Sequence, residues 1–269
     1  MATFELVTPQ WLASNSHQPA LVVIDARSAA DYWQGHIPAA RHFDPALLAL
    51  VRTDAGSLAR FQALLTWALS SLGISAQSQV VVVGAQNDTP AAKVAWALAY
   101  AGVARIALLD GGQAAWQGEL AQAAPQWAPV SYTLDPQSAY LATAQDVLAA
   151  AQGGGIVLDA RTREEFDGQR SNAGRKGRVP NARFWDSRHE LGENGLFAPS
   201  AAVSGQAAQA GAQPDNPSIV YCGGGGRASR TFLALQLAGH PAAVYPASWL
   251  EWGVDTQYPV QEAAPQAAS

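Results

Sequence analysis

The sequence predicts an α/β protein built from two similar domains, each a parallel sheet with helices on both faces. Short runs of Val, Ile and Leu are apolar without alternation, which is typical of strands that are covered on both faces. Segments with helical spacing lie between these runs, as connections between parallel strands require. The whole pattern occurs twice in a chain of 269 residues, which is long enough for two cores of ordinary size.

Two motifs of the first half recur in the second half. Residues 21–27 (LVVIDAR) correspond to residues 155–161 (GIVLDAR), and residues 35–40 (GHIPAA) correspond to residues 177–182 (GRVPNA). Because the pattern occurs twice at a long spacing, it indicates a duplicated domain rather than a solenoid of short repeats.

The elements of each copy follow one another in the same order. The expected strands cover residues 22–25, 80–83 and 106–109 in the first copy, and 156–159, 219–222 and 244–245 in the second. The expected helices cover residues 58–72, 91–101 and 228–238, and Gly73 and Gly239 are natural helix ends. A proline-rich stretch without periodicity joins the copies. We therefore place the first domain at residues 8–122, the linker at 123–138 and the second domain at 139–256.

The chain has one cysteine, Cys222, which ends an expected strand and precedes four glycines, residues 223–226. An ordered glycine costs about 0.5–1 kcal/mol relative to alanine, so four in a row indicate a backbone that must approach something closely. Inward-facing N–H groups, the next helix N-terminus and Arg227 all favour an anion, and such surroundings lower the pKa of a cysteine. Gly84 stands at the equivalent position of the first copy, so only the second copy can hold a thiol nucleophile.

The composition excludes several kinds of partner. A formal net charge of −5 without runs of Lys or Arg gives no reason to expect a nucleic acid. One cysteine excludes an internal disulfide, and the five histidines lack metal-ligand spacing, so we expect no metal and no cofactor. No apolar run approaches about 18 residues, and the first residues lack the pattern of a signal peptide. We therefore expect no membrane partner and a cytoplasmic location. The oligomeric state stays open, with a monomer plausible.

Taken in order, these motifs resemble the two-domain rhodanese-type sulfurtransferases, which include thiosulfate and 3-mercaptopyruvate sulfurtransferases. The likeness extends from Thr8 to Val254 and includes the motifs of both copies, the Cys222 loop and residues 248–253 (SWLEWG). The resemblance implies two tandem rhodanese-like domains, an inactive first copy and a catalytic second copy. It also implies that Cys222 accepts sulfane sulfur from a small anionic donor as a persulfide. The acceptor would be thiophilic, such as cyanide or a thiol.

The resemblance also implies which residues bind the donor. By position Arg175 is the best match to a donor-binding arginine of the family, followed by Arg178 and Arg227. Ser248 either donates a hydrogen bond to the donor or stabilises a turn. The loop glycines are expected to bind the donor through their N–H groups, and they are Gly223, Gly224, Gly225 and Gly226. Whether the donor is thiosulfate or 3-mercaptopyruvate stays open.

Several positions depart from the family pattern, and two others are shared with the inactive copy. Glu165 stands where the family often has an arginine. Asp159 and Arg161 match Asp25 and Arg27 of the inactive copy, so we expect this pair to be structural rather than catalytic.

Two other functions remain open from the sequence. Cysteine-dependent phosphatases and arsenate reductases also place a cysteine in an anion-binding loop, but they need Cys-x5-Arg, whereas Arg227 follows Cys222 after the glycines of residues 223–226. Alternatively, the chain is a rhodanese-like scaffold that binds protein partners without catalysis. The intact loop around Cys222 argues against such a scaffold.

Overall fold

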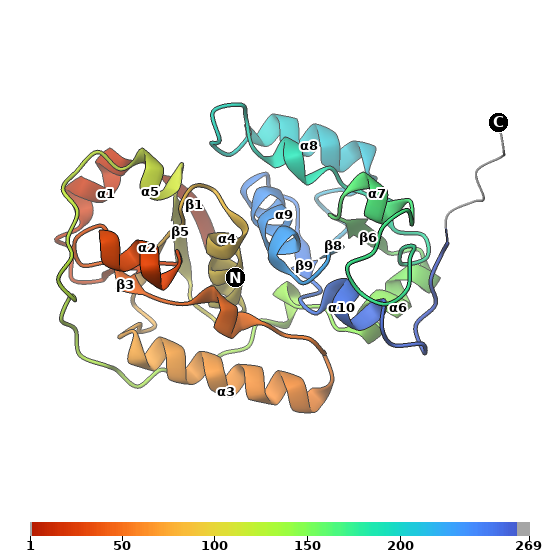
Figure 1. The fold of residues 1–269 in the computed structure, drawn as a ribbon, viewed down its shortest axis with the longest axis horizontal. Helices are drawn as coiled ribbons and strands as arrows, with labels where there is room; N and C mark the ends of the chain where they lie inside the picture. Colours follow the sequence, from red (N-terminus) through yellow and green to blue (C-terminus); the bar gives the residue numbers. More distant parts are fainter. Residues whose placement is uncertain (1, 263–269) are drawn as a thin grey trace. The chain divides into compact units, whose positions relative to one another are not determined.

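The computed structural model describes residues 2–262, and these residues form two compact units (Figure 1). The first unit comprises the residues through Ala49, residues 55–140 and residues 191–198. The second unit comprises residues 50–54, residues 141–190 and the chain from Pro199 onward. Each half of the sequence therefore contributes a short segment to the unit that the other half forms.

The first unit contains a five-stranded parallel sheet with the strand order β1-β5-β4-β2-β3. Its strands are β1 (Thr3–Val7), β2 (Leu21–Asp25), β3 (Arg41–His42), β4 (Gln79–Val83) and β5 (Arg105–Leu109). Its helices are α1 (Pro9–Asn15), α2 (Ala29–Gln34), η1 (Pro45–Leu48), α3 (Ala55–Ser71), α4 (Thr89–Tyr100), α5 (Gly112–Ala115) and η2 (Ser138–Tyr140).

Both faces of this sheet are covered, which explains why its strands are apolar without alternation. Val81 of β4 belongs to a cluster on one face that includes Leu12 of α1. Ile24 of β2 lies against the opposite side, where it meets Leu65 of α3 and Val94 of α4. The predicted α/β arrangement, a parallel sheet flanked by helices, is thereby confirmed for this unit.

The second unit contains a four-stranded parallel sheet with the strand order β7-β6-β8-β9. Its strands are β6 (Ile156–Asp159), β7 (Arg183–Phe184), β8 (Ser218–Tyr221) and β9 (Ala242–Val244). Its helices are α6 (Ala144–Gly153), α7 (Arg163–Phe166), η3 (Ser187–Glu190), α8 (Ser200–Gln209), α9 (Gly226–Leu237) and α10 (Ser248–Trp252). The carboxyl ends of β6, β7 and β8 meet at one edge of the sheet, and ligands bind at this edge in open parallel sheets.

The strand register confirms the duplication that the sequence predicts. β2 pairs with β4 so that Asp25 lies opposite Val83, and β6 pairs with β8 so that Asp159 lies opposite Tyr221. Since Val83 and Tyr221 are equivalent, the next residues, Gly84 and Cys222, are equivalent as well.

The segment that joins the two copies in the sequence is packed rather than free. The indole N–H of Trp127 donates to the Ser71 carbonyl at 2.8 Å, and the buried Tyr132 hydroxyl donates to the Ala101 carbonyl at 3.0 Å. Both contacts lie within the first unit. Among the described residues, no helix is long and apolar enough to cross a membrane.

Candidate active site at Cys222

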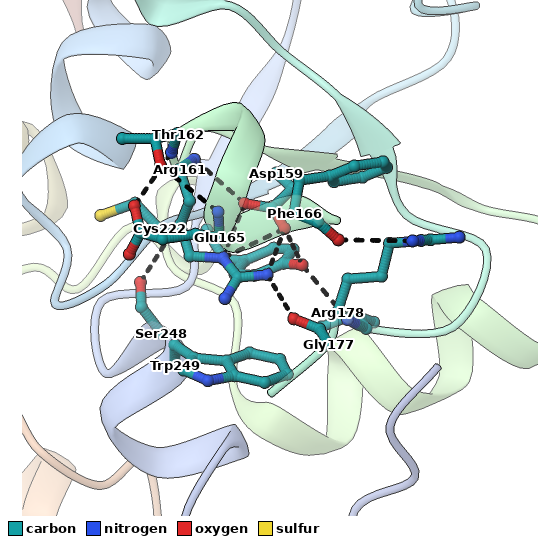
Figure 2. Close-up of polar contacts among 12 residues, drawn as sticks. Asp159, Arg161, Thr162, Glu165, Phe166, Gly177, Arg178, Cys222, Ser248 and Trp249 are labelled. Carbon is teal, nitrogen blue, oxygen red and sulfur yellow. Dashed lines mark hydrogen bonds and ion pairs between the residues drawn. The ribbon is translucent and has the colours of Figure 1, made fainter. Parts of the chain in front are cut away.

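Cys222 lies where β8 ends, in the short loop that leads to α9, and only 2% of its surface is exposed. Its backbone is held from both sides by α10. Its N–H donates to Ser248 Oγ at 3.0 Å, and its carbonyl accepts the N–H of Trp249 at 3.0 Å (Figure 2). The sulfur therefore occupies a fixed position at the carboxyl edge of the sheet.

Gly225 provides a backbone N–H group that faces the sulfur. This nitrogen lies 3.2 Å from Cys222 Sγ. Gly225 has φ of +91°, and a β-carbon at this position would lie 2.6 Å from the carbonyl oxygen of Pro246, so only glycine fits. Because α9 begins at the next residue, the positive end of its dipole also lies near the sulfur. The loop can therefore stabilise a thiolate or the anionic sulfur of a persulfide.

Arg227, in the first turn of α9, is paired with Glu165. Its Nη1 lies 2.8 Å from Glu165 Oε2, which also accepts the backbone N–H of Thr162 at 2.9 Å. Burial opposes ionisation of Glu165, but the hydrogen bonds from Arg227 and Thr162 outweigh burial and lower the pKa of this carboxyl. Burial also disfavours the Arg227 cation, yet Glu165 and the neighbouring Cys222 raise its pKa. The pair thus brings a cation to the loop without adding net charge.

A second ion pair lies at the end of β6. Arg161 Nη2 is 2.7 Å from Asp159 Oδ2, and both side chains are fully buried. The Tyr221 hydroxyl donates to the same carboxylate, and burial together with Asp159 raises the pKa of Tyr221 well above its usual value. In the first unit Asp25 and Arg27 form the same ion pair at 2.6 Å. A pair that also occurs beside Gly84 is part of the framework, as the sequence led us to expect.

The guanidinium of Arg175, the arginine ranked first for donor binding, contacts the protein itself. It donates to the carbonyl oxygens of Trp252 and Asp255 at 2.7 Å each, and to that of Tyr258 at 2.9 Å. The Arg175 backbone N–H donates to the Gly253 carbonyl at 2.9 Å. Arg175 thus fastens its loop to the end of α10 and to the residues that follow α10.

Arg178 and Ser248 also have protein partners. The Arg178 side chain points away from Cys222 (Figure 2), and its Nη1 lies 3.3 Å from the Phe166 carbonyl oxygen while its guanidinium covers the Phe166 ring. The buried Ser248 hydroxyl donates to the Tyr245 carbonyl at 2.7 Å and accepts the Cys222 N–H. These are the contacts of a residue that stabilises a turn, one of the two roles considered for Ser248.

The structure brings most of the predicted site residues together. Cys222, the glycines of residues 223–226, Arg227 and Ser248 form one loop and its support. The guanidinium groups of Arg175 and Arg178 contact other parts of the second unit instead.

Asn172 was missed by the sequence analysis. It belongs to the stretch between residues 159 and 177 that is longer than its counterpart in the first copy. A β-carbon placed on Gly223 would lie 2.6 Å from Asn172 Nδ2 and 3.2 Å from Arg227 Nη2. Two nitrogen donors therefore converge over Gly223, beside Cys222. The only sequence signal was the extra length of this loop.

Thr53, from the first half of the chain, was missed as well. Its N–H and hydroxyl donate to the two carboxylate oxygens of Glu251 at 3.0 and 2.8 Å, and Glu251 lies on α10. The Thr53 hydroxyl also accepts the N–H of Ala144 at 2.9 Å, and the Tyr245 hydroxyl donates to Glu251 at 2.9 Å. Residues 50–54 thus fasten the helix that holds Cys222. No local pattern reveals a contact between residues so far apart in the sequence.

A cavity of about 270 Å³ lies beside Arg227, between the loops that follow β6, β7 and β8. Three more arginines line it, and each is paired with a carboxylate: Arg161 with Asp159 at 2.7 Å, Arg163 with Asp167 at 2.7 Å and Arg188 with Asp186 at 2.6 Å. Most of the residues that line the cavity are charged, so it can admit a small polar molecule to this side of the loop.

The first unit has the same framework without the reactive group. Asp88 accepts the N–H groups of Ala85 at 2.8 Å and Ala91 at 3.0 Å. A β-carbon on Gly84 would lie 2.5 Å from Asp88 Oδ1. The Asp88 side chain therefore caps α4 and lies beside Gly84, the position that Cys222 has in the second unit. Within residues 2–262, no group of three or more His, Cys, Asp or Glu side chains is placed to hold a metal ion.

Comparison with known proteins agrees with this geometry. The model of the rhodanese-like domain matches residues 8–119 and 143–255. A thiosulfate sulfurtransferase of Azotobacter vinelandii is 27% identical over 95% of this chain and 96% of its own length. A probable 3-mercaptopyruvate sulfurtransferase of Pseudomonas aeruginosa is 30% identical over 97% and 99%.

Solved structures with this fold include SseA from Escherichia coli, a 3-mercaptopyruvate sulfotransferase. It has a TM-score of 0.77 at 25% identity and covers 92% of this chain and 99% of its own. EanB in complex with hercynine has a TM-score of 0.85 at 22% identity, over 97% of this chain and 70% of its own, and shares the fold.

Proposed function

Since the chain belongs to the rhodanese-like domain family and is a two-domain sulfurtransferase, we propose that it moves sulfane sulfur from a small anionic donor to a thiophilic acceptor through a persulfide on Cys222. The observation that carries this proposal is the environment of the thiol. Cys222 Sγ faces the N–H of Gly225 at 3.2 Å, near the start of α9, and the first unit has Gly84 instead. Such an environment favours an anionic sulfur before and after the transfer.

In the first half-reaction the Cys222 thiolate attacks the transferable sulfur of the donor, and a new S–S bond forms. The bond between this sulfur and the donor breaks, and its electron pair leaves on sulfite from thiosulfate, or on the enolate of pyruvate from 3-mercaptopyruvate. The enolate then takes a proton. In the second half-reaction the acceptor attacks the outer sulfur, and the S–S electron pair returns to Cys222 as a thiolate.

The loop serves both half-reactions because the negative charge stays on sulfur beside the loop, first on Cys222 Sγ and then on the outer sulfur of the persulfide. The Gly225 N–H stabilises the attacking thiolate and then the persulfide, while hydrogen bonds from α10 keep the Cys222 backbone fixed. A preorganised donor of this kind requires no rearrangement during the reaction.

The names of the relatives support thiosulfate or 3-mercaptopyruvate as the donor. We propose cyanide or a thiol as the thiophilic acceptor. We further propose a cytoplasmic location, because a reducing compartment keeps a single thiol reduced. The proposed domain limits are residues 8–122 and 139–256. A nucleic-acid or membrane partner is not proposed.

The phosphatase and scaffold alternatives are not favoured. A phosphatase loop needs Cys-x5-Arg to encircle a tetrahedral oxyanion, whereas Arg227 comes one residue too early. A scaffold that only binds protein partners does not require a thiol that faces a backbone N–H group, as Cys222 does.

Initial rates with thiosulfate and with 3-mercaptopyruvate, each with cyanide as the acceptor, test the proposal. The wild-type protein is expected to form thiocyanate from at least one donor with ping-pong kinetics, and Cys222→Ser is expected to form none. Hydrolysis of an aryl phosphate without thiocyanate from either donor would show that the assigned reaction is wrong.

A further inference from the structure

We infer that Asn172 is a donor-binding residue whose side-chain amide, together with Arg227, holds an oxygen-bearing end of the sulfur donor over Gly223. The inference rests on the proposed sulfur transfer and assigns a further residue to the same site. It identifies the donor as a molecule that carries an oxyanion group next to its transferable sulfur.

The loop that carries Asn172 is held in place by hydrogen bonds. The indole N–H of Trp249 lies 3.1 Å from Ser171 Oγ and 3.0 Å from the Arg175 carbonyl oxygen. Ser171 Oγ lies in turn 2.6 Å from the Ala173 carbonyl oxygen. The residues on either side of Asn172 are therefore fixed by hydrogen bonds. This gives Arg175 a role as a positioning residue, because its guanidinium holds the same loop to the end of α10.

One short helix positions both the thiol and the amide. The backbone N–H of Trp249 donates to the Cys222 carbonyl, while the Trp249 indole holds the loop of Asn172. The separation between Asn172 and Cys222 thus depends on α10 and not on a flexible segment. Groups that are placed before the ligand arrives bind it with a smaller loss of entropy.

The chemistry of the two groups defines the ligand. Asn172 Nδ2 and Arg227 Nη2 both face Gly223, and both are hydrogen-bond donors. Within residues 2–262, the exposed Asn172 side chain has no hydrogen-bond partner, so its amide is available. Arg227 shares its charge with Glu165, so the amide adds a hydrogen bond without adding charge. A carboxylate or the oxygens of thiosulfate can accept from both donors at once.

Persulfide formation in single turnovers of the full-length protein tests the inference. The probes are thiosulfate, 3-mercaptopyruvate and inorganic polysulfide, which carries sulfane sulfur but no oxygen. Asn172→Ala is expected to weaken binding of at least one oxygen-bearing donor by about 10-fold, the effect of losing a hydrogen bond to a charged group. The rate with polysulfide and the KM for cyanide should stay unchanged, because neither involves the oxyanion.

Two matched variants sharpen this test. Asn172→Asp is expected to weaken binding of the same donor further than Asn172→Ala does, since it places a negative charge beside an anion. Gln169→Ala removes an exposed amide from the same loop and should behave like the wild type. An effect limited to thiosulfate or to 3-mercaptopyruvate supports the inference and identifies the donor.

Unchanged binding of both oxygen-bearing donors by Asn172→Ala would overturn the inference and leave the sulfur transfer intact. An equal loss with polysulfide would also overturn it, because the loop would then act through the position of Cys222. Failure of the wild-type protein to form a persulfide with any probe would instead overturn the proposed function, and this inference with it.

Discussion

Arg227 and Glu165 show how single residues adjust the charge beside the thiol. A buried cation without a partner costs several kcal/mol, so a paired Arg227 can remain beside Cys222 where an unpaired one would be expensive. The pairing also weakens the attraction between Arg227 and an anion. Binding of an anionic sulfur donor would therefore depend more on neutral hydrogen-bond donors. Glu165, which stands where the family often has an arginine, therefore stabilises Arg227 as a cation beside the loop.

Glu165→Gln should destabilise the fold at neutral pH by about 1–3 kcal/mol, since Arg227 keeps its charge and loses its ionic partner. The pKa of Glu165 in the folded protein lies below its ordinary value of 4.5. Its contribution is therefore complete above pH 4.5 and is lost as the pH falls through the lower, folded-state value.

Urea unfolding at neutral pH and below pH 4.5 measures this effect, and Glu193→Gln provides an exposed control. The gap in unfolding free energy between the wild type and Glu165→Gln should narrow in acid. A gap of the same size at both pH values would show that the ion pair does not stabilise the fold.

Residue roles were predictable only where they follow from local sequence. The position of Cys222 between a strand and four glycines was enough to propose it as the nucleophile. Arg175 and Asn172 lie in the same loop, and Arg175 was predicted to bind the anionic donor because it is basic. The carbonyl groups that bind the Arg175 guanidinium belong to residues 252–258, far away in the sequence, so these contacts could not be predicted.

At the scale of elements, α10 connects the parts of the site although it has only five residues. It holds the Cys222 backbone through Ser248 and Trp249, and it holds the loop of Asn172 through the Trp249 indole. Residues 50–54 support it in turn through Glu251. A helix this short has little stability of its own, so it depends on these contacts.

Thr53→Val tests this support. The variant removes the hydroxyl that binds Glu251 and leaves the buried N–H of Ala144 without an acceptor, so the unfolding free energy should fall by about 1–3 kcal/mol. Because α10 positions the thiol itself, persulfide formation should slow with every donor, polysulfide included. This pattern differs from the one expected for Asn172→Ala.

Thr53→Ser keeps the hydroxyl and should restore both the unfolding free energy and the rate. Urea unfolding and single-turnover kinetics measure the two effects. If Thr53→Val has the stability and the rate of the wild type, residues 50–54 do not support the site.

The elements that the sequence predicts are those with a strong apolar signal. β4 and β8 contain continuous apolar runs and appear where they were expected. β3 and β7 have two residues each, and two residues are too few for a hydrophobic pattern to predict a strand. α8 was missed because its sequence, SAAVSGQAAQ, buries only Val203 and Ala207 and consists mostly of small and polar residues.

For the whole molecule, duplication explains both the fold and the presence of a single site. The two sheets share their register, and the second unit alone combines a thiol with a glycine loop. In the first unit Asp88 caps α4, and a side chain at Gly84 would collide with it. The exchange of residues 50–54 and 191–198 between the units could not be predicted, because it arises from long-range packing.

The mass of the intact protein after incubation with thiosulfate, 3-mercaptopyruvate or polysulfide tests the central claim most directly. With a productive donor, each chain should gain one sulfur atom, because Cys222 is the only thiol. The gain should disappear when cyanide is added and should be absent in Cys222→Ser. No gain with any of the three donors, or the same gain in Cys222→Ser, would contradict the account.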